Sequence, residues 1–378
     1  MPELLKAIGL MSGTSMDGID VALIESDGET IKSFGPTLFV EYSHARKQRI
    51  EAALEDGEQV VERADRPGDW EALERDITSW HAEAVELFLK HGNVTKAEID
   101  LIGFHGQTML HRPDDALTVQ LGDGQALADA TGIDVVYDMR AKDMTVGGQG
   151  APLVPAFHAA LARQFDRSDD SVWPVAFVNI GGISNATYVD RDGTIAAFDC
   201  GPGNALIDQW VQMEAAIPYD QGGRIALEGG INAKIVNRYM ASPFFARRGP
   251  KSLDRNDFPP LKSGEAELSD GARSLARVTA QAIVESGKLM PSVPRRWVVC
   301  GGGRKNSIIV DDMIALSAPG TIVEVAEAVG LDGDMMEAQA FAFLAICSRA
   351  NLPLTYPTTT GCTQPVSGGV FAAASTSN

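Results

Sequence analysis

Two short apolar runs on either side of a small, polar segment open the hydrophobic pattern of the chain. Ala7–Met11 and Ile19–Ile24 are apolar, and residues 12–18 between them include two glycines, three hydroxyl side chains and an aspartate. This pattern predicts a β-hairpin, and glycine at 13 and 18 allows positive φ and close backbone approach at its tip. Backbone N–H groups and hydroxyls at such a tip can surround a phosphate. Taken alone, however, the tip favours an ordinary tight hairpin.

A long amphipathic helix is predicted further along, after a strand at Thr37–Tyr42. Apolar residues recur there at steps of three and four, which is the spacing of one face of an α-helix. These positions are Trp70, Leu73, Ile77, Trp80, Ala84 and Leu87. We expect this face to pack on the core and assign it no chemistry.

Two predicted strands run directly into polar residues. Ile99–Phe104 leads into His105-Gly106-Gln107-Thr108, and Ile195–Phe198 leads into Asp199-Cys200-Gly201-Pro202. Polar side chains at the carboxyl ends of strands are well placed to contact ligands. His105 fits a structural hydrogen bond and a ligand contact equally well. Asp199 is the best carboxylate candidate for catalysis, and its alternative role is to organise an Asx-turn.

A second strand–turn–strand pattern echoes the first. Val175–Ile180 and Ala186–Val189 flank the tip Gly181-Gly182-Ile183-Ser184-Asn185. One such hairpin in each half indicates a duplicated fold with a cleft between the halves. The run Gly147–Gly150, which precedes two prolines, marks a boundary. We therefore expect one domain at 1–145 plus the tail at about 340–378, and a second at 146–339.

The remaining pattern is that of an α/β protein. The tail Thr358–Asn378 is expected to be irregular and to lie against the first half. Strands are predicted at Ile133–Tyr137, Arg296–Cys300 and Thr321–Val325, and helices at Ala126–Thr131, Ala205–Met213, Ile225–Met240, Gly271–Leu289, Ser307–Leu316 and Ala340–Ala350.

Other candidate residues each have two interpretations. Gly301-Gly302-Gly303 follows a strand and would let a flat ligand lie on bare backbone. Arg140 could pair with Asp138 or Asp143 on the surface, or present its donor fork to a ligand oxygen. Glu337 could be an ordinary acid in the first turn of a helix, or could point at a substrate hydroxyl.

Phosphate chemistry of the Walker type is disfavoured. The small basic loop Arg247–Ser252 could contact a phosphate, but the G-x-x-x-x-G-K-[ST] pattern occurs nowhere in the sequence.

Composition narrows the class of protein. The chain has 378 residues, with 51 acidic and 32 basic side chains and a net charge of −19, which argues against broad nucleic-acid binding. Residues 1–6 lack the pattern of a signal peptide, and no apolar run approaches the length of a membrane span. The four cysteines have no metal-ligand spacing. These features predict a reduced, cytoplasmic protein that binds small molecules.

Seven segments, in one order along nearly the whole chain, resemble the anhydro-N-acetylmuramic acid kinase family. They are Gly9–Asp20, His105–Thr108, Gly147–Pro155, Asn179–Asn185, Phe198–Asn204, Gly249–Ser252 and Cys300–Gly303. The segment Met335–Gln339 differs from the family's usual sequence around Glu337, which puts the packing of Ala338 in question.

The resemblance implies an α/β fold with two ribonuclease-H-like domains around a central cleft, as in actin-like ATPases and sugar kinases. It implies ATP and a divalent cation, Mg²⁺, as requirements, and an anhydro-amino sugar as substrate. Water would attack C1 of 1,6-anhydro-N-acetylmuramic acid while O6 attacks the γ-phosphate, which gives N-acetylmuramic acid 6-phosphate in peptidoglycan recycling. No nucleic acid or membrane partner is implied, and the sequence is compatible with a homodimer.

The resemblance also assigns roles to residues. Asp199 matches the general base. His105, Arg140 and Glu337 match positions associated with the sugar, and Arg140 is a natural partner for its lactyl carboxylate. The nucleotide would be held by the first hairpin tip, the second hairpin tip and the triple glycine: Ser12, Gly13, Thr14, Ser15, Met16, Asp17, Gly18, Ile19, Gly181, Gly182, Gly301, Gly302 and Gly303.

Two alternatives stand beside this interpretation. A kinase of another 1,6-anhydro sugar, levoglucosan, would keep Asp199 but would offer no carboxylate for Arg140 to bind. An ATP-driven binding module like the chaperones of the same superfamily would need a peptide-binding extension, and the sequence contains no such extension.

Overall fold

The computed structural model describes residues 3–13, 15–253 and 257–375, which form two compact units. The first unit comprises Met1–Leu161 and Glu337–Asn378, and the second comprises Ala162–Met336. Residues 146–161 thus group with the first unit, where Phe157 of this segment packs on Phe343 with ring centroids 5.7 Å apart. The expected domain limits at 145 and 340 stay a prediction.

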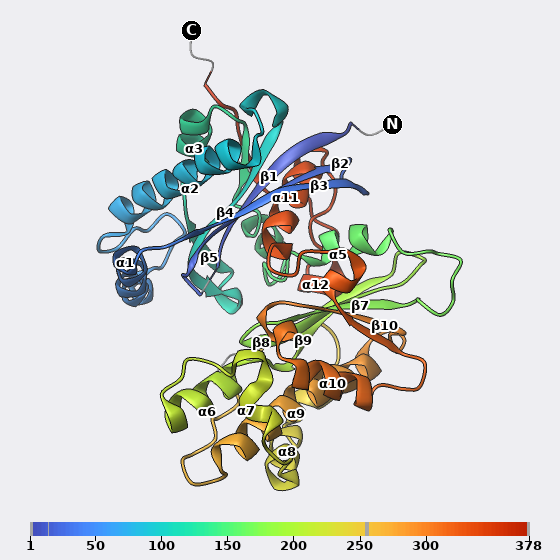
Figure 1. The fold of residues 1–378 in the computed structure, drawn as a ribbon. Helices are drawn as coiled ribbons and strands as arrows, with labels where there is room; N and C mark the ends of the chain where they lie inside the picture. Colours follow the sequence, from blue (N-terminus) through green and yellow to red (C-terminus); the bar gives the residue numbers. More distant parts are fainter. Residues whose placement is uncertain (1–2, 14, 254–256, 376–378) are drawn as a thin grey trace. The chain divides into compact units, whose positions relative to one another are not determined.

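The first unit is built on a seven-stranded mixed sheet (Figure 1). Its order is β12-β6-β4-β1-β2-β3, with β5 paired to β4. β2 is antiparallel to β1 and β3, whereas β4 and β6 run parallel to β1 and to each other. The strands are β1 Leu5–Ser12, β2 Gly18–Ser26, β3 Ile31–Glu41, β4 Leu101–Arg112, β5 Leu117–Leu121, β6 Val135–Tyr137 and β12 Val370–Ala372.

The second unit repeats this arrangement in a five-stranded sheet of order β11-β10-β7-β8-β9. β7 and β8 form an antiparallel hairpin, β9 continues it, and β10 and β11 are parallel to β7. Both sheets therefore begin with three antiparallel strands and add two parallel ones beside the first. The predicted α/β class with two ribonuclease-H-like units is confirmed. The strands are β7 Val175–Ile180, β8 Ile183–Val189, β9 Ile195–Pro202, β10 Arg296–Cys300 and β11 Ile322–Val325.

Helices cover the sheets of both units, and single 3₁₀ turns connect several elements. The α-helices are α1 His44–Leu54, α2 Trp70–Gly92, α3 Gly124–Thr131, α4 Ala141–Thr145, α5 Pro155–Ala162, α6 Ala205–Ala215, α7 Arg224–Leu227, α8 Ala233–Met240, α9 Leu268–Ser286, α10 Ser307–Leu316, α11 Met336–Arg349 and α12 Pro357–Thr360. The 3₁₀ turns are η1 Glu55–Gln59, η2 Lys96–Glu98, η3 Pro113–Asp115, η4 Gln221–Gly223, η5 Pro243–Ala246, η6 Gly287–Leu289, η7 Gly302–Lys305 and η8 Ala326–Val329.

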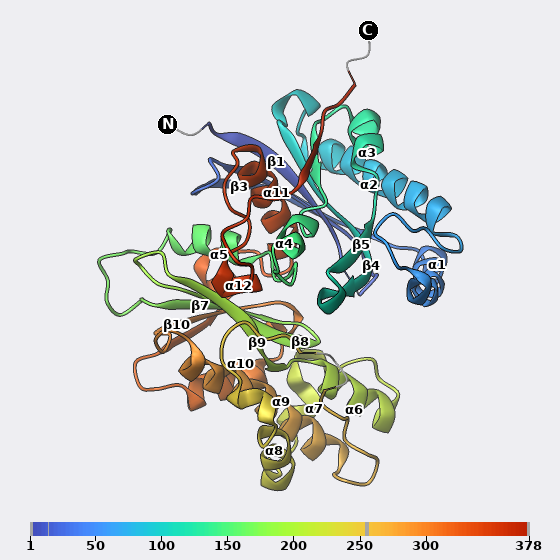
Figure 2. The ribbon, with the colours of Figure 1, turned by 180° about the vertical axis from the view of Figure 1, so that it is seen from behind.

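Two glycines let α11 lie directly on the first sheet, on the face opposite α2 (Figures 1 and 2). Gly9 of β1 pairs with Gly103 of β4. A Cβ atom at Gly9 would lie 1.8 Å from the carbonyl oxygen of Ala338, and one at Gly103 would lie 2.0 Å from that of Phe341. The other face of β1 presents Ile8 and Leu10 to the core that includes the apolar stripe of α2.

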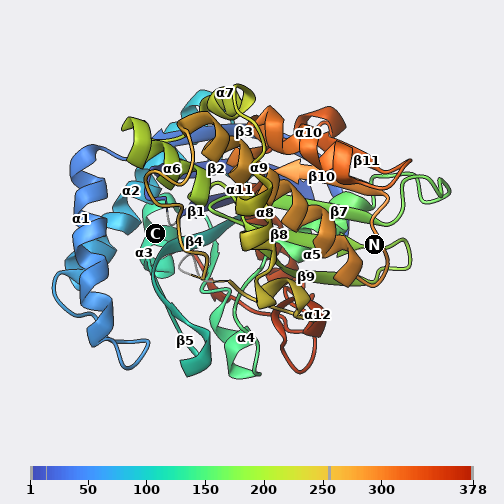
Figure 3. The ribbon, with the colours of Figure 1, turned by 90° about the horizontal axis from the view of Figure 1, so that it is seen from below.

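The helices of the second unit pack over one face of its sheet, with α9 in the middle (Figure 3). The side of α9 that faces the core is made largely of alanine, serine and other small residues, and eleven of its nineteen residues are buried. Trp210 of α6 is fully buried against α9, and its indole N–H donates to the carbonyl of Leu268 at 2.8 Å. The core of the second unit therefore lies between β7–β10 and these helices.

Most predicted elements are confirmed in type, but several are wrong in extent. β3 begins at Ile31, six residues before the strand expected at Thr37–Tyr42, and β8 begins at Ile183, within the predicted tip. β4 and β9 continue through His105–Thr108 and Asp199–Pro202, so these residues lie within strands and not after them. The single helix expected at Ile225–Met240 is two helices, because Gly229 crosses the backbone of Ser269 so closely that a Cβ would lie 2.1 Å from its carbonyl oxygen.

The tail is more regular than expected. β12 pairs antiparallel with β6, which confirms that the tail lies against the first sheet. Among the described residues, no helix combines the length and the apolar character needed to cross a membrane.

Candidate active site

Arg140 and His105 are joined directly in the first unit. β4 carries His105, and Arg140 precedes α4, three residues after β6. The Arg140 Nη2 and Nε atoms lie 3.0 and 3.3 Å from His105 Nε2, and Nη1 donates to the carbonyl of Gly150 at 2.9 Å. No hydrogen bond or ion pair joins Arg140 to Asp138 or Asp143; Asp138 accepts from Arg63, and Asp143 accepts from the N–H of Gly150.

The contact with Arg140 defines the protonation state of His105. A guanidinium can only donate, so Nε2 of His105 must be the acceptor and its proton must be on Nδ1. Burial and then the Arg140 charge hold the pKa of His105 well below its usual value. Its ring also packs on Phe341 of α11, with centroids 4.6 Å apart. At neutral pH, His105 is an uncharged acceptor that positions Arg140.

Glu337 joins this group electrostatically. It lies in the first turn of α11, and burial raises its pKa while the charge of Arg140 opposes that rise. Burial lowers the pKa of Arg140 to about 10, and Glu337 acts against this shift. Arg140 therefore stays charged at neutral pH. The structure brings together all three residues predicted to contact the sugar.

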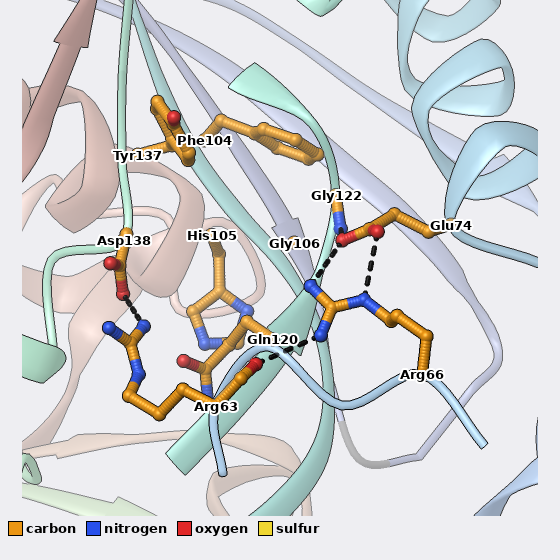
Figure 4. A pocket seen from close by; sticks show the side chains of 10 residues that line it. All are labelled: Arg63, Arg66, Glu74, Phe104, His105, Gly106, Gln120, Gly122, Tyr137 and Asp138. Atoms are coloured by element: carbon orange, nitrogen blue, oxygen red, sulfur yellow. Dashed lines mark hydrogen bonds and ion pairs between the residues drawn. The ribbon is translucent and has the colours of Figure 1, made fainter. Parts of the chain in front are cut away.

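A cavity of about 120 Å³ opens beside His105 in the same unit (Figure 4). Two arginines from the segment between η1 and α2 line it, and both are already paired. Arg63 donates to Asp138 at 2.6 Å and to the carbonyl of Thr118, and Arg66 forms two bonds of 2.9 Å with Glu74. The cavity is therefore polar but close to neutral. Arg63 and Arg66 cannot be selected from the sequence, because nothing in their local pattern indicates which carboxylates they pair with.

The first hairpin tip is held to β4 by its own polar groups. The hydroxyl of Ser12 donates to the carbonyl of Gly106 at 3.1 Å, and the Gln107 amide donates to the carbonyl of Gly13. Ser15 donates to Asp17 at 2.7 Å, and both side chains are exposed. Gly13 and Ser15–Asp17 thus form a partly exposed turn, whereas Gly18, also predicted for the tip, is the buried first residue of β2.

Met16 and Ile19 of the predicted tip differ in backbone conformation and burial. Met16 has a φ of 53°, in the left-handed region, and its N–H donates to the carbonyl of Gly13. Ile19 is fully buried in the core, so only its backbone can reach a ligand. Thr14 lies outside the described residues.

The second hairpin tip is tied to the start of α6. The carbonyls of Gly181 and Gly182 accept the N–H groups of Gly203, Asn204 and Ala205 at 2.7–3.2 Å. These N–H groups at the start of α6 are consequently satisfied by protein. An anion at this tip would have to use the N–H groups of Gly181 and Gly182 themselves, and that of Gly181 already contacts the carbonyl of Ile183.

The three glycines after β10 differ in the space that surrounds them. A Cβ at Gly301 would lie 2.1 Å from Asn179 Oδ1, and one at Gly303 would lie 2.2 Å from Ile180 Cγ2, so both are needed for packing. Gly302 is exposed and has open space beside its Cα. Of the three, Gly302 is therefore the one whose bare backbone is available to a ligand.

Asp199 lies on β9 of the second unit and is partly buried. The N–H of Leu253 donates to its Oδ2 at 2.8 Å, and its Oδ1 makes no hydrogen bond with a described residue. Burial raises the pKa of Asp199 to about 6, against the Leu253 hydrogen bond and the charge of Lys251. The carboxylate thus combines an available oxygen with a proton affinity suited to general-base chemistry near neutral pH.

Metal-binding side chains do not cluster. Within residues 3–13, 15–253 and 257–375, no three His, Cys, Asp or Glu side chains gather as a metal site. The carboxylate of Asp17 is exposed at the first hairpin tip. Mg²⁺ often uses one or two carboxylates together with substrate phosphates, and a single acid of this kind fits that requirement.

These features define an α/β protein of two ribonuclease-H-like units with a glycine-rich tip in each and a candidate general base in the second. The family model for anhydro-N-acetylmuramic acid kinase matches residues 5–374. The chain belongs to the anhydro-N-acetylmuramic acid kinase family, which makes it a phosphotransferase.

Curated relatives agree with this assignment. The chain is 51% identical over 375 residues to the anhydro-N-acetylmuramic acid kinase of Agrobacterium fabrum. The alignment covers 99% of this chain and 100% of that protein. It is 53% identical over 366 residues to the one of Rhizobium etli, with 97% and 98% covered.

Similar solved structures are more distant. A ROK hexokinase from Thermus thermophilus has a TM-score of 0.40 at 13% identity, with 92% of this chain and all of that chain covered. An activator of 2-hydroxyisocaproyl-CoA dehydratase from Clostridium difficile has a TM-score of 0.45 at 12% identity, with 92% and 96% covered. Similarity at this level indicates nothing about the reaction.

Proposed function

We propose that this enzyme opens 1,6-anhydro-N-acetylmuramic acid with water and phosphorylates O6 with ATP, forming N-acetylmuramic acid 6-phosphate and ADP in peptidoglycan recycling. The observation that carries the proposal is Asp199, whose Oδ1 makes no hydrogen bond with a described residue and whose raised pKa suits removal of a proton from water. The family relationship supplies the substrate. The relatives' names do not favour levoglucosan as the substrate.

Asp199 accepts a proton from the water that attacks C1, and the bond from C1 to O6 breaks. The released O6 takes the γ-phosphoryl group, and ADP leaves. Phosphoryl transfer needs mainly positioning and charge neutralisation from the protein. His105, Arg140 and Glu337 hold the sugar, with Arg140 fixed in direction by His105.

The first hairpin tip (Ser12–Ile19), Gly181, Gly182 and Gly301–Gly303 hold the nucleotide in this proposal. Asp17 would hold Mg²⁺ against the phosphate oxygens, where the cation supplies charge neutralisation. Gly302 leaves space for the adenosine.

Labelled water tests the proposed reaction. With ATP, the anhydro sugar and H₂¹⁸O, we expect one ¹⁸O atom at C1 of the product and none in its phosphate. Product made in unlabelled water and then incubated in H₂¹⁸O corrects for exchange at C1. Label in inorganic phosphate without sugar product would mean ATP hydrolysis and would refute the proposal.

Replacement of Asp199 tests the base. Asp199→Asn should retain ATP and sugar binding by calorimetry and lose about 10²–10⁴ in kcat. Asp208→Asn is the control, because burial also raises the pKa of Asp208 to about 6. In the wild type, kcat/KM should fall as pH drops through about 6, and Asp208→Asn should not change this. Near-normal turnover by Asp199→Asn would remove the base role.

A further inference from the structure

Lys251 is a buried cation that the proposed reaction leaves without a role. It retains only 7% of its exposure, and its Nζ donates to the carbonyl of Phe244 at 3.3 Å. Nζ also lies 4.2 Å from the ring centroid of Phe244 and 5.5 Å from that of Phe198. Among the described residues, no carboxylate lies within ion-pair distance of Nζ. An unpaired buried ammonium is costly, which calls for an explanation.

The backbone around Lys251 is attached to the candidate base. The N–H of Asp199 donates to the carbonyl of Lys251 at 3.0 Å, and the N–H of Leu253 donates to Asp199 Oδ2 at 2.8 Å. One short segment therefore holds both the main chain and the carboxylate of Asp199. The same segment carries the Lys251 ammonium, which lies over the ring of Phe198, the residue before Asp199.

We propose that Lys251 is a positioning residue that keeps the Asp199 carboxylate ionised and directed for proton removal; this rests on the proposed role of Asp199. In a partly buried setting, an opposite charge nearby favours the charged form of a carboxyl group. The aromatic faces and the Phe244 carbonyl stabilise the ammonium without neutralising its charge. No ion pair with a described residue neutralises this charge, and it lowers the pKa of Asp199 against the rise that burial causes.

The other charged and titratable groups nearby do not replace Lys251. Burial raises the pKa of the neighbouring Cys200 thiol to about 12, so it stays neutral. Burial lowers the pKa of Lys251, and the charge of Arg247 adds to this shift whereas the charge of Asp199 opposes it. Glu285 and Lys288 line a cavity of about 130 Å³ that Lys251 also borders. That space can accommodate a larger cationic side chain at position 251.

Three variants separate charge from structure. Lys251→Met keeps the length and apolar packing and removes the charge, Lys251→Arg keeps the charge, and Lys288→Met removes an exposed lysine from the same cavity. With ¹³Cγ-labelled aspartate in the full-length protein, and the Asp199 signal assigned by its loss in Asp199→Asn, NMR titration gives the pKa of Asp199. We expect it to rise by about one unit in Lys251→Met and to stay unchanged in Lys251→Arg and Lys288→Met.

The acidic limb of the pH profile of kcat/KM should shift by the same amount as the pKa of Asp199. At a pH below that limb, Lys251→Met should lose about tenfold in kcat/KM relative to wild type, and the loss should vanish at high pH. An unchanged Asp199 pKa in Lys251→Met would overturn the inference. Normal turnover by Asp199→Asn would instead refute the base role and leave the NMR result standing.

A reciprocal measurement requires no change at Lys251. Coupling between two titrating groups is mutual, so Asp199→Asn should lower the pKa of Lys251 by as much as Lys251→Met raises that of Asp199. ¹³Cε-labelled lysine reports this value if Lys251→Met does not fold. A Lys251 pKa that does not respond to Asp199→Asn would contradict the inference.

Discussion

Single residues of the candidate site could be selected from the sequence where chemistry alone points to them. Asp199, His105 and Arg140 were selected because each follows a predicted strand as a polar or charged side chain. Their partners could not be predicted. Arg140 contacts His105 and Gly150, which are 35 and 10 residues away in sequence, and only the fold of the first unit brings these groups together.

The burial of Lys251 could not be predicted from the sequence, for a related reason. The segment Arg247–Ser252 has the composition of a basic surface loop, and a phosphate contact was the natural hypothesis. In the structure, its lysine lies against Phe244 and Phe198. Local composition does not contain this information, since the covering rings come from η5 and β9.

Replacement of His105 tests its role as the acceptor for Arg140. His105→Phe leaves two buried Arg140 donors without their partner, a cost of about 1–3 kcal/mol that would release the guanidinium from its position. We expect KM for the sugar to rise about 10- to 100-fold with little change in KM for ATP. His105→Gln, which keeps an acceptor oxygen, should recover part of the loss.

His81→Phe is the matched control for steady-state kinetics with each substrate varied. His81 is also buried in the same unit, but its ring nitrogen contacts the carbonyl of Ile77 and not Arg140. An unchanged sugar KM in His105→Phe would show that Arg140 does not depend on His105.

Whole elements were easier to predict than their ends. The type of most strands followed from short apolar runs, and the second hairpin was found by its likeness to the first, whereas β5 and β12 were not predicted. The ends of β4 and β9 were wrong, because pairing with β5 and β8 continues the strands through polar residues. The break between α7 and α8 was also missed, because it depends on how closely Gly229 passes α9.

The contact between α11 and the first sheet gives a prediction at the level of elements. Gly9→Ala places a methyl group against the backbone of Ala338, which cannot move without displacing α11. We expect the free energy of unfolding to fall by about 2–3 kcal/mol, measured by urea denaturation. Because Glu337 lies in the first turn of this helix, the sugar KM should rise as well.

Gly57→Ala is the control for Gly9→Ala in the same unit. The nearest atom to a Cβ there is the Met109 carbonyl oxygen at 3.6 Å, an ordinary contact. Equal stability of Gly9→Ala and Gly57→Ala would refute the close approach of α11.

At the scale of the whole molecule, the titrating groups are divided unequally between the two units. All six histidines lie in the first unit. Burial lowers the pKa of His81 and His111 to about 4, that of His158 to about 3, and that of His105 well below 6.5. In the second unit, burial instead raises the pKa of Asp199 and Asp208 to about 6. Four histidines with lowered pKa outnumber Glu337, whose raised pKa acts the other way in the first unit, so the two units should respond to acid in opposite directions.

The direction in which stability changes with pH follows from the number of protons that the folded and unfolded states bind. A histidine with a lowered folded pKa stabilises the fold above pH 6.5, and this stability is lost as pH falls below 6.5, by up to about 1.4 kcal/mol per pH unit for each group. A carboxyl group with a raised folded pKa does the reverse, and stabilises the folded state as pH falls through 6. Between pH 7 and 5, the first unit should lose stability, while the stability of the second unit should stay constant or increase.

Hydrogen exchange measured by mass spectrometry, corrected for the intrinsic pH dependence, distinguishes the two units. We expect peptides from α2 to lose protection between pH 7 and 5 while peptides from α9 keep theirs. His81→Phe should reduce the loss in α2, because this side chain no longer takes up a proton on unfolding. Equal loss of protection in α2 and α9 would contradict the prediction, since a general acid effect acts on both units, whereas neutral buried histidines act only on the first.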